Sequence, residues 1–327
     1  MVDLAVTVRD ICAVRPTVER FAEATPVRPC DGFSAVADAH VLLKLDNLQP
    51  TGSFKVRGAA ARIGSLDGEA RARGVITAST GNHGRAVAHV ARRLGIPATV
   101  CLSENVPAGK VEALRRLGCR VDVGGASQDE ALVRARAAAS ADGGPTLVHP
   151  FLDPVVVAGQ GTCGLELAEQ VPEVGTVLVP LSGGGLAAGV AVAVRSLRPT
   201  ARIVGVSMDR GAAMHASLAA GHPVEVAEVD DSLADSLQGG IGLDNDVTFP
   251  IVAALVDEVV LVTEDEIAAG MRSALVDHRL VLEGAGAVGL AAILAEKVSA
   301  DDRSPVVVVC SGANAELAQI ARLATSP

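Results

Sequence analysis

From Gly74 onward, short apolar segments alternate with segments of helical periodicity, and this alternation constrains the fold more than any other feature of the sequence. The apolar segments are rich in Val, Leu and Ile, which is typical of strands buried on both faces. The predicted strands lie at 75–78, 96–102, 121–123, 146–150, 177–181, 203–206, 259–262 and 306–309. Strands that alternate with helices of about three turns predict parallel sheets flanked by helices, and hence an α/β fold.

The chain is long enough for more than one hydrophobic core. With 327 residues it exceeds what one core commonly serves, so we expect two lobes. Aromatic residues make up only 2% of the chain, while hydrophobic residues reach 49%. Ala, Val and Leu must therefore fill the core.

Charge and cysteine content argue against several classes of protein. The net charge of −10 disfavours binding to nucleic acid or to an anionic membrane, because both are negatively charged. No apolar run reaches the ~18 residues that span a bilayer, and we see no signal peptide. The six cysteines are scattered without a C-x-x-C pair, which favours buried thiols over disulfides or zinc ligands. We therefore expect a cytoplasmic protein.

Polar or glycine-rich stretches follow three of the predicted strands, at 79–84, 182–186 and 311–314. In parallel sheets, ligands bind at the carboxyl ends of the strands. All three stretches would lie at such ends, so we expect the functional site there.

The stretch 182–186 is a glycine-rich turn between a strand and a helix. Glycines let backbone N–H groups converge and the helix dipole adds positive potential, so the turn suits a phosphate. On the residues alone it could also be a tight structural turn or part of a dinucleotide site. Gly183, Gly185 and Ala188 satisfy the G-x-G-x-x-A pattern of NAD enzymes, and Asp209 follows the next strand.

The stretch 79–84 precedes a predicted helix at 85–94. Its small hydroxyls and backbone amides suit a carboxylate, and the side-chain amide of Asn82 can bond a phenolic oxygen. The stretch could equally be a helix cap. His83, taken alone, is better explained as a structural residue than as a catalytic one.

Lys55 follows a turn at 50–52 and precedes a predicted helix at 59–63. Apolar neighbours and the like charge of Arg57 would both lower the pKa of its amine, because both disfavour the ammonium form. A neutral amine can form a Schiff base. The alternative is a solvated lysine near the start of a helix.

Four motifs, in order and spacing, resemble the threonine/serine dehydratase family of fold type II pyridoxal-phosphate enzymes. They are Ser-Phe-Lys-Val-Arg-Gly-Ala at 53–59, Ser-Thr-Gly-Asn-His-Gly at 79–84, Ser-Gly-Gly-Gly-Leu at 182–186 and Ser-Gly-Ala-Asn at 311–314. The stretches 158–162 and 283–287 extend the resemblance over nearly the whole chain. A mid-chain glycine turn combined with a cofactor lysine favours this family over an NAD-dependent oxidoreductase or a catalytically silent binding protein.

The resemblance implies a two-lobed α/β fold of the tryptophan synthase β type, with parallel-rich sheets flanked by helices. A large cofactor-binding domain would comprise residues 1–73 and 150–327, and a small mobile domain residues 74–149. Closure of the small domain would exclude water from the site. The implied cofactor is pyridoxal 5′-phosphate, the implied partner is a small amino-acid substrate, and the implied assembly is a homodimer.

Individual roles also follow from the resemblance. Lys55 would be the Schiff-base lysine and the acid/base at the α carbon, Asn82 would bond the 3′-oxygen, and Ser311 would face the pyridine nitrogen. The other implied cofactor contacts are Phe54, Ser182, Gly183, Gly184, Gly185, Leu186 and Glu283. The substrate carboxylate would be held by Ser79, Thr80, Gly81, Asn82 and His83.

The implied reaction is elimination of the β-hydroxyl group from an amino acid such as threonine or serine, giving a 2-oxo acid and ammonia. A neutral hydroxyl at the pyridine nitrogen favours prompt loss of the β-substituent over a long-lived carbanion. A serine/threonine racemase is the alternative. Thr80, a candidate catalytic hydroxyl, stands where racemases carry serine, and its stiffness at χ1 disfavours racemisation.

Two further features of the sequence bear on metal use and on the substrate. Ser207 and Ala213 occupy positions that are acidic in metal-activated relatives, so we expect no metal site there. The segments 205–215 and 234–245 resemble the subgroup called hydroxyectoine utilisation dehydratase. That resemblance predicts a larger hydroxylated amino acid, derived from hydroxyectoine, as the physiological substrate.

Overall fold

The computed structural model describes residues 4–79, 81–106, 108–227, 229, 231–299 and 304–325. Its larger sheet has six strands in the order β1-β2-β10-β7-β8-β9. All neighbouring strands of this sheet are parallel except β1 and β2. These strands are β1 (Val27–Pro29), β2 (Val41–Lys44), β7 (Thr176–Pro180), β8 (Arg202–Met208), β9 (Glu258–Val262) and β10 (Val306–Val309).

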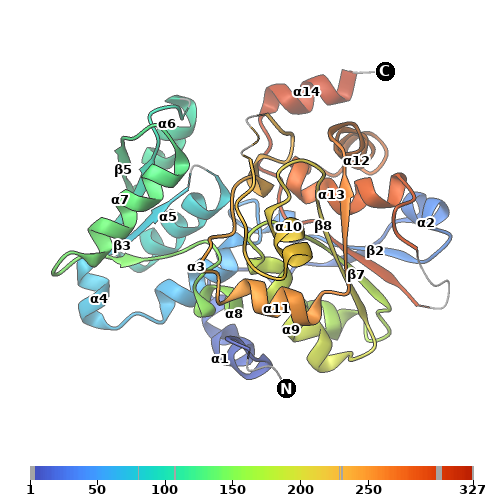
Figure 1. Cartoon of the computed structure of the whole chain (residues 1–327), viewed down its shortest axis with the longest axis horizontal. Coiled ribbons are helices and arrows are strands. Elements are labelled where there is room, and N and C mark those ends of the chain that lie inside the picture. The colour runs from blue at the N-terminus through green and yellow to red at the C-terminus, as the bar shows by residue number, and fades with distance from the viewer. Residues whose placement is uncertain are drawn as a thin grey trace.

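The smaller sheet has four parallel strands in the order β5-β4-β3-β6 and lies to the left of the larger one in Figure 1. Its strands are β3 (Val75–Ala78), β4 (Ala98–Leu102), β5 (Arg120–Val123) and β6 (Thr146–Leu147). All four lie within 74–149, for which the sequence predicts a small domain. The division of the chain into two domains stays a prediction.

Helices cover both faces of the larger sheet, as the alternation of the sequence predicts. One face packs against α1 (Val8–Val18), α8 (Pro154–Gln170), α9 (Gly185–Leu197), α10 (Ala213–Ala220) and α11 (Thr248–Leu255). The other packs against α2 (Asp31–Ala37), α12 (Glu264–Val276) and α13 (Gly284–Leu294), with α14 (Leu317–Thr325) resting on α12. Successive valines of β10 alternate between the two cores, so a continuous apolar run serves both faces.

The smaller sheet is covered by α5 (Asn82–Leu94) and α6 (Ala108–Arg116) on one side and by α7 (Gln128–Ser140) on the other. Between the two sheets, α3 (Lys55–Gly64) packs against both α5 and α8, near the short α4 (Gly68–Arg73). Two 3₁₀ turns complete the described elements, η1 (Asp46–Leu48) and η2 (Asp235–Leu237). The helix that begins with Lys55 therefore connects the two halves of the molecule.

Small residues let neighbouring helices approach closely in this aromatic-poor core. On α8, a Cβ added to Gly164 would lie 2.9 Å from the Cα atom and carbonyl oxygen of Val190 on α9. The two helices therefore pack backbone against backbone, which gains dispersion contacts without large side chains.

Several elements begin earlier than the sequence predicts, or were not predicted. α5 begins at Asn82 and not at Arg85, because Gly84 packs directly against the Ser79 carbonyl, where a Cβ would clash. The region 222–250, expected to be irregular, contains η2 and the start of α11. Within the described residues, no helix combines the length and apolar character needed to cross a membrane.

Candidate active site

Three chain segments meet at the carboxyl edge of the larger sheet, where the sequence predicts the site. The neighbouring strands β2, β10 and β7 are followed by the segments that carry Lys55, Ser311 and the glycine turn 182–186. The register pairs Val309 with Lys44, and Val308 with both Leu43 and Leu178. The three strands therefore end close to one level, and the segments emerge side by side.

The turn before Lys55 is joined to the segment after β10 by backbone hydrogen bonds. The N–H of Phe54 donates to the Ser311 carbonyl at 3.0 Å, and the N–H of Ala313 donates to the Gly52 carbonyl at 2.9 Å. α3 begins at Lys55 itself, earlier than predicted. Lys55 is thus held on the first turn of a largely buried helix, beside Ser311.

Within the described residues, the amine of Lys55 forms no ion pair or hydrogen bond, unlike the amines of the other lysines. Those three form ion pairs: Lys44 with Glu166, Lys110 with Asp235 and Glu316, and Lys297 with Glu266. Among the described residues, which include all four lysines, none pairs with the Lys55 amine, which lies 5.0 Å from the centre of the Phe54 ring. Burial lowers the pKa of this amine to about 8, against an opposing effect of the Glu283 charge.

Arg57 does not contribute to this pKa shift, contrary to the prediction, because carboxylates neutralise its charge. It belongs to a buried ion cluster formed by Lys44, Asp46, Arg57 and Glu166. Its Nε lies 2.7 Å from Asp46 Oδ2 and its Nη1 lies 2.6 Å from Glu166 Oε1. Glu166 Oε2 is in turn 2.6 Å from the Lys44 amine. Two cations and two anions therefore balance in a cluster that fastens α3 to β2, η1 and α8.

Glu283 joins Asn82 and Asn314 into a hydrogen-bonded network near Lys55. Asn82 Nδ2 donates to Glu283 Oε1 at 2.6 Å, and the Asn314 N–H donates to Oε2 at 3.1 Å. Asn314 Nδ2 donates to Asn82 Oδ1 at 2.6 Å. Burial, reinforced by the Asp235 charge, raises the pKa of Glu283 to about 7. Asn82 Nδ2 has two hydrogens and donates only one of them within the described part of the chain, so one N–H is available to a ligand.

The stretch before α5 is shorter than the predicted carboxylate loop. Ser79 Oγ accepts a hydrogen bond from the Gly81 N–H at 3.4 Å. Gly81 is the N-cap residue of α5 and has no side chain to cap the first-turn N–H groups, which therefore suit a carboxylate. Thr80, predicted as a catalytic and substrate-binding residue, lies outside the described residues.

Two buried histidines adjoin Val148 at the end of β6. His83 Nε2–H donates to the Val148 carbonyl at 2.9 Å. His149 Nδ1 accepts from the backbone N–H groups of Leu152 at 2.9 Å and Phe151 at 3.3 Å. Burial, followed by nearby positive charge, lowers the pKa of His83 to about 3 and that of His149 to about 4, so both rings are neutral near pH 7. The sequence predicted a role for His83 but not for His149.

The glycine turn ends at the buried N-terminus of α9. Gly184 is the N-cap residue, with a φ of 87° that favours glycine, and no side chain caps the helix. Thr248 Oγ1 holds the turn by donating to the Gly183 carbonyl at 2.6 Å. Phe151 packs on Gly183, where a Cβ would lie 2.6 Å from the ring. Ser182 is partly exposed at the start of the turn. Buried, uncapped N–H groups at a helix start are complementary to a phosphate.

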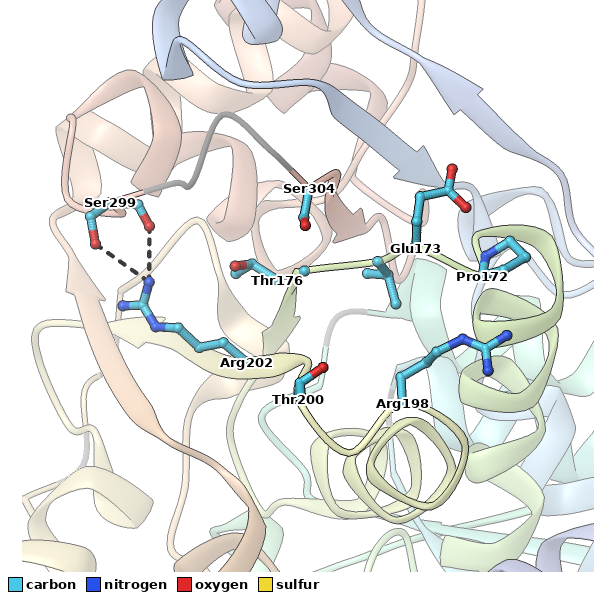
Figure 2. Close-up of a pocket in the computed structure, with 10 residues that line it drawn as sticks. Pro172, Glu173, Thr176, Arg198, Thr200, Arg202, Ser299 and Ser304 are labelled. Atoms are coloured by element: carbon cyan, nitrogen blue, oxygen red, sulfur yellow. Dashed lines mark hydrogen bonds between the residues drawn. The ribbon is translucent and has the colours of Figure 1, made fainter.

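A cavity of about 560 Å³ lies away from this site, at the opposite edge of the larger sheet. It is lined by Thr176 and Arg202, the first residues of β7 and β8. Figure 2 shows Arg202 directed toward Ser299, to which it donates hydrogen bonds. Arg198 donates to the backbone carbonyls of Leu197 and Ala168. The cavity lies at the amino ends of β7 and β8, away from the segments that carry Lys55, Ser311 and the glycine turn, so we do not place the functional site there.

Ser207 and Ala213, the two positions considered for a metal site, are both buried, and neither side chain has a carboxylate that could bind a metal ion. Within the described residues, no group of three or more His, Cys, Asp or Glu side chains is arranged to hold a metal ion. The absence of a metal requirement stays a prediction.

Comparison with known proteins identifies the family. The family described as "Pyridoxal-phosphate dependent enzyme" matches residues 18–312. A protein of Sinorhizobium fredii with a provisional assignment as a threonine dehydratase is 52% identical over 303 residues, covering 93% of this chain and 90% of the relative. The L-threonine ammonia-lyase of Thermotoga maritima is 40% identical over 318 residues, covering 97% of this chain and 78% of the relative.

Solved structures agree with this assignment. The structure of maize serine racemase superimposes with a TM-score of 0.89 at 33% sequence identity, covering 97% of this chain and 96% of the racemase. The NAD alternative for the glycine turn is thereby set aside, because the match extends across Lys55, the turn and Ser311. The chain belongs to the pyridoxal-phosphate dependent enzymes, with the α/β architecture of fold type II.

Proposed function

We propose that this chain eliminates the β-hydroxyl group of threonine or serine and yields a 2-oxo acid and ammonia, with pyridoxal 5′-phosphate as cofactor. The observation that carries the proposal is the partly buried amine of Lys55 at the start of α3, which forms no ion pair with the described residues. Each of the other three lysines forms an ion pair with a carboxylate. The L-threonine ammonia-lyase of Thermotoga maritima supports the reaction type.

The residues of the site fit the cofactor. The uncapped N–H groups at the start of α9 suit its phosphate, and the spare N–H of Asn82 suits its phenolic oxygen. Lys55 would hold it covalently, Ser311 would face its ring nitrogen, and Phe54 and Glu283 would adjoin its ring. When bound, the cofactor supplies an electron sink for the charge that develops at the α carbon of the substrate.

The chain's own residues supply the proton transfer and the orientation. An amine with a pKa of about 8 is partly neutral at neutral pH, so Lys55 can accept the proton of the α carbon. The N–H groups at the start of α5, with Ser79 and Gly81, would orient the carboxylate. A serine hydroxyl at the pyridine nitrogen does not enforce ring protonation, which favours prompt loss of the β-substituent.

Racemisation is the second candidate activity, because maize serine racemase shares this fold at 33% identity. The two activities differ in the group that protonates the opposite face of the α carbon. This chain carries threonine at position 80, and its branched side chain has fewer rotamers than serine. We therefore propose elimination as the main activity.

A larger substrate derived from hydroxyectoine is the finer proposal. Its support is the resemblance of the segments 205–215 and 234–245 to the hydroxyectoine utilisation dehydratases. A Cβ added to Gly242 would lie 3.4 Å from Leu152 Cδ1, so the second segment adjoins the turn that follows His149. The test compares kcat/KM for threonine, serine and ring-opened hydroxyectoine derivatives. A preference for threonine by orders of magnitude would identify an ordinary catabolic threonine dehydratase instead.

The role of Lys55 has a direct chemical test. Borohydride reduction of the cofactor-loaded protein, followed by peptide mass spectrometry, should locate the cofactor on Lys55. Lys55→Ala should lose both the visible absorbance of bound cofactor and the release of 2-oxo acid while remaining folded. Lys110→Ala, which removes a surface lysine, is the matched control and should retain both. Cofactor found on another lysine would refute the assignment.

A further inference from the structure

His149 carries a buried hydrogen-bond donor that nothing in the described chain satisfies. Only 6% of the residue is exposed. Its Nδ1 accepts hydrogen bonds from the N–H groups of Leu152 and Phe151, so the ring hydrogen must be on Nε2. Nε2 has no partner among the described residues. A buried N–H without an acceptor is costly, and such groups in native structures point to an unseen partner.

His83 shows the opposite arrangement. Its Nε2–H donates to the Val148 carbonyl, so its Nδ1 carries a lone pair. This Nδ1 is buried and, within the described chain, has no donor. His83 is bonded to the carbonyl of the residue that precedes His149, so the ring with an unsatisfied acceptor and the ring with an unsatisfied donor adjoin the same residue, Val148.

Both rings belong to the surroundings of Lys55. His149 packs edge-on against Phe151 with ring centres 4.9 Å apart, and Phe151 packs on Gly183 of the phosphate turn. His83 follows Asn82, which is bonded to Glu283. Besides burial, which is the main cause, the positive charge of Lys55 lowers the pKa of both histidines.

A hydroxyl group satisfies both nitrogen atoms at once, because its oxygen accepts a hydrogen bond while its hydrogen donates one. A carboxylate has only acceptors and would oppose the lone pair on His83 Nδ1, whereas an ammonium has only donors and would oppose the N–H of His149. We propose that His149 Nε2–H and His83 Nδ1 together bind the β-hydroxyl group of the substrate, as specificity-determining residues. The inference rests on the proposed function. It assigns the His83 ring to the β-hydroxyl group of the substrate, and no longer to the carboxylate.

Two substitutions of His149 separate this role from a structural one. The amide of asparagine reaches about as far as Nδ1, and that of glutamine about as far as Nε2. His149→Asn therefore keeps an acceptor for the Leu152 N–H and loses the donor to the substrate. His149→Gln keeps a donor near Nε2 and loses the acceptor for the turn. If His149 only holds the turn, the His149→Asn variant should be more active on threonine than the His149→Gln variant. If His149 recognises the hydroxyl group, the His149→Gln variant should be the more active one.

The measurement is kcat/KM of the cofactor-loaded enzyme for L-threonine and for β-chloro-L-alanine, whose chloride needs neither nitrogen. The His149→Asn substitution should lower the ratio of threonine to chloroalanine by about 10–100-fold, the range of one lost buried hydrogen bond. The His149→Gln substitution should restore most of that ratio. Thermal unfolding of each variant shows whether it is folded.

The outcomes distinguish this inference from the proposed function. Equal losses on both substrates, or a glutamine variant with a lower ratio than the asparagine variant, would overturn hydroxyl recognition and leave the elimination reaction standing. Wild-type protein that eliminates from neither substrate would overturn the proposed function, and the inference with it.

Discussion

At the scale of the residue, the lowered pKa of the partly buried Lys55 amine predicts how cofactor uptake depends on pH. Only the neutral amine attacks an aldehyde, and its pKa is about 8 instead of the ordinary 10.5. The rate at which cofactor-free protein takes up pyridoxal phosphate should therefore rise with pH and level off above pH 8. Stopped-flow visible absorbance between about pH 6 and 10 measures this rate. A rate that still climbs steeply above about pH 9 would contradict the lowered pKa.

The buried ion cluster around Arg57 predicts how a substitution there changes the free energy of unfolding. Arg57→Leu would leave Asp46 and Glu166 buried with too little positive charge, and breaking a buried ion pair from one side costs about 3–5 kcal/mol. Arg15→Leu is the matched control, because Arg15 and Glu169 are partly exposed and such pairs contribute about 0–1 kcal/mol. Chemical denaturation of the three proteins gives both differences. Similar losses in the two variants would show that the buried ion cluster is not held as described.

At the scale of the element, the strands and the helix starts with a capping residue, such as α7 after Ser127 and α12 after Thr263, were predictable, whereas the helix starts inside the polar motifs were not. Parallel strands buried on both faces appear as apolar runs such as 306–309, which need no tertiary information to identify. α5 and α9 begin inside the polar motifs, because Gly84 and Gly185 allow the backbone to coil next to other chain segments. The short α2 and α4 were missed because so few residues give little periodicity.

The start of α9 carries a prediction of its own. Gly184→Ala would place a Cβ at a φ of 87° and only 2.9 Å from Met214 Cε and Thr248 Cβ. The backbone strain costs about 1–2 kcal/mol, and displacement of the turn should also weaken phosphate binding. Gly95→Ala is the matched control. Gly95 has a φ of 68°, but an added Cβ would meet no atom within 4 Å, so this variant has the backbone strain without the displacement of the turn.

Thermal unfolding and the dissociation constant of pyridoxal phosphate separate the two effects. Both variants should be destabilised, and only Gly184→Ala should bind the cofactor more weakly. Unchanged cofactor affinity in that variant would argue against a phosphate at the start of α9.

At the scale of the whole molecule, the candidate site draws on segments that adjoin both sheets, which limits how far a sequence can predict it. Lys55, Asn82 and the glycine turn could be proposed from the sequence because each lies in a motif of consecutive residues. Asp46, Glu166 and His149 were not, because their importance depends on partners or burial that other elements supply. Charged residues in apolar segments, at Lys44 and Glu166, are the signal that the sequence offers for the buried ion cluster.

Independence from divalent metal is also a property of the whole molecule, since an activating ion could bind anywhere in the fold. Ca²⁺ and Mg²⁺ need several oxygen ligands, most of them carboxylates, and Ser207 and Ala213 supply none where metal-activated relatives are acidic. Elimination from threonine by cofactor-loaded protein should therefore be unchanged after dialysis against a chelator. The control adds Mg²⁺ back to the dialysed enzyme. A several-fold fall on chelation that Mg²⁺ reverses would mean that other residues bind an activating ion.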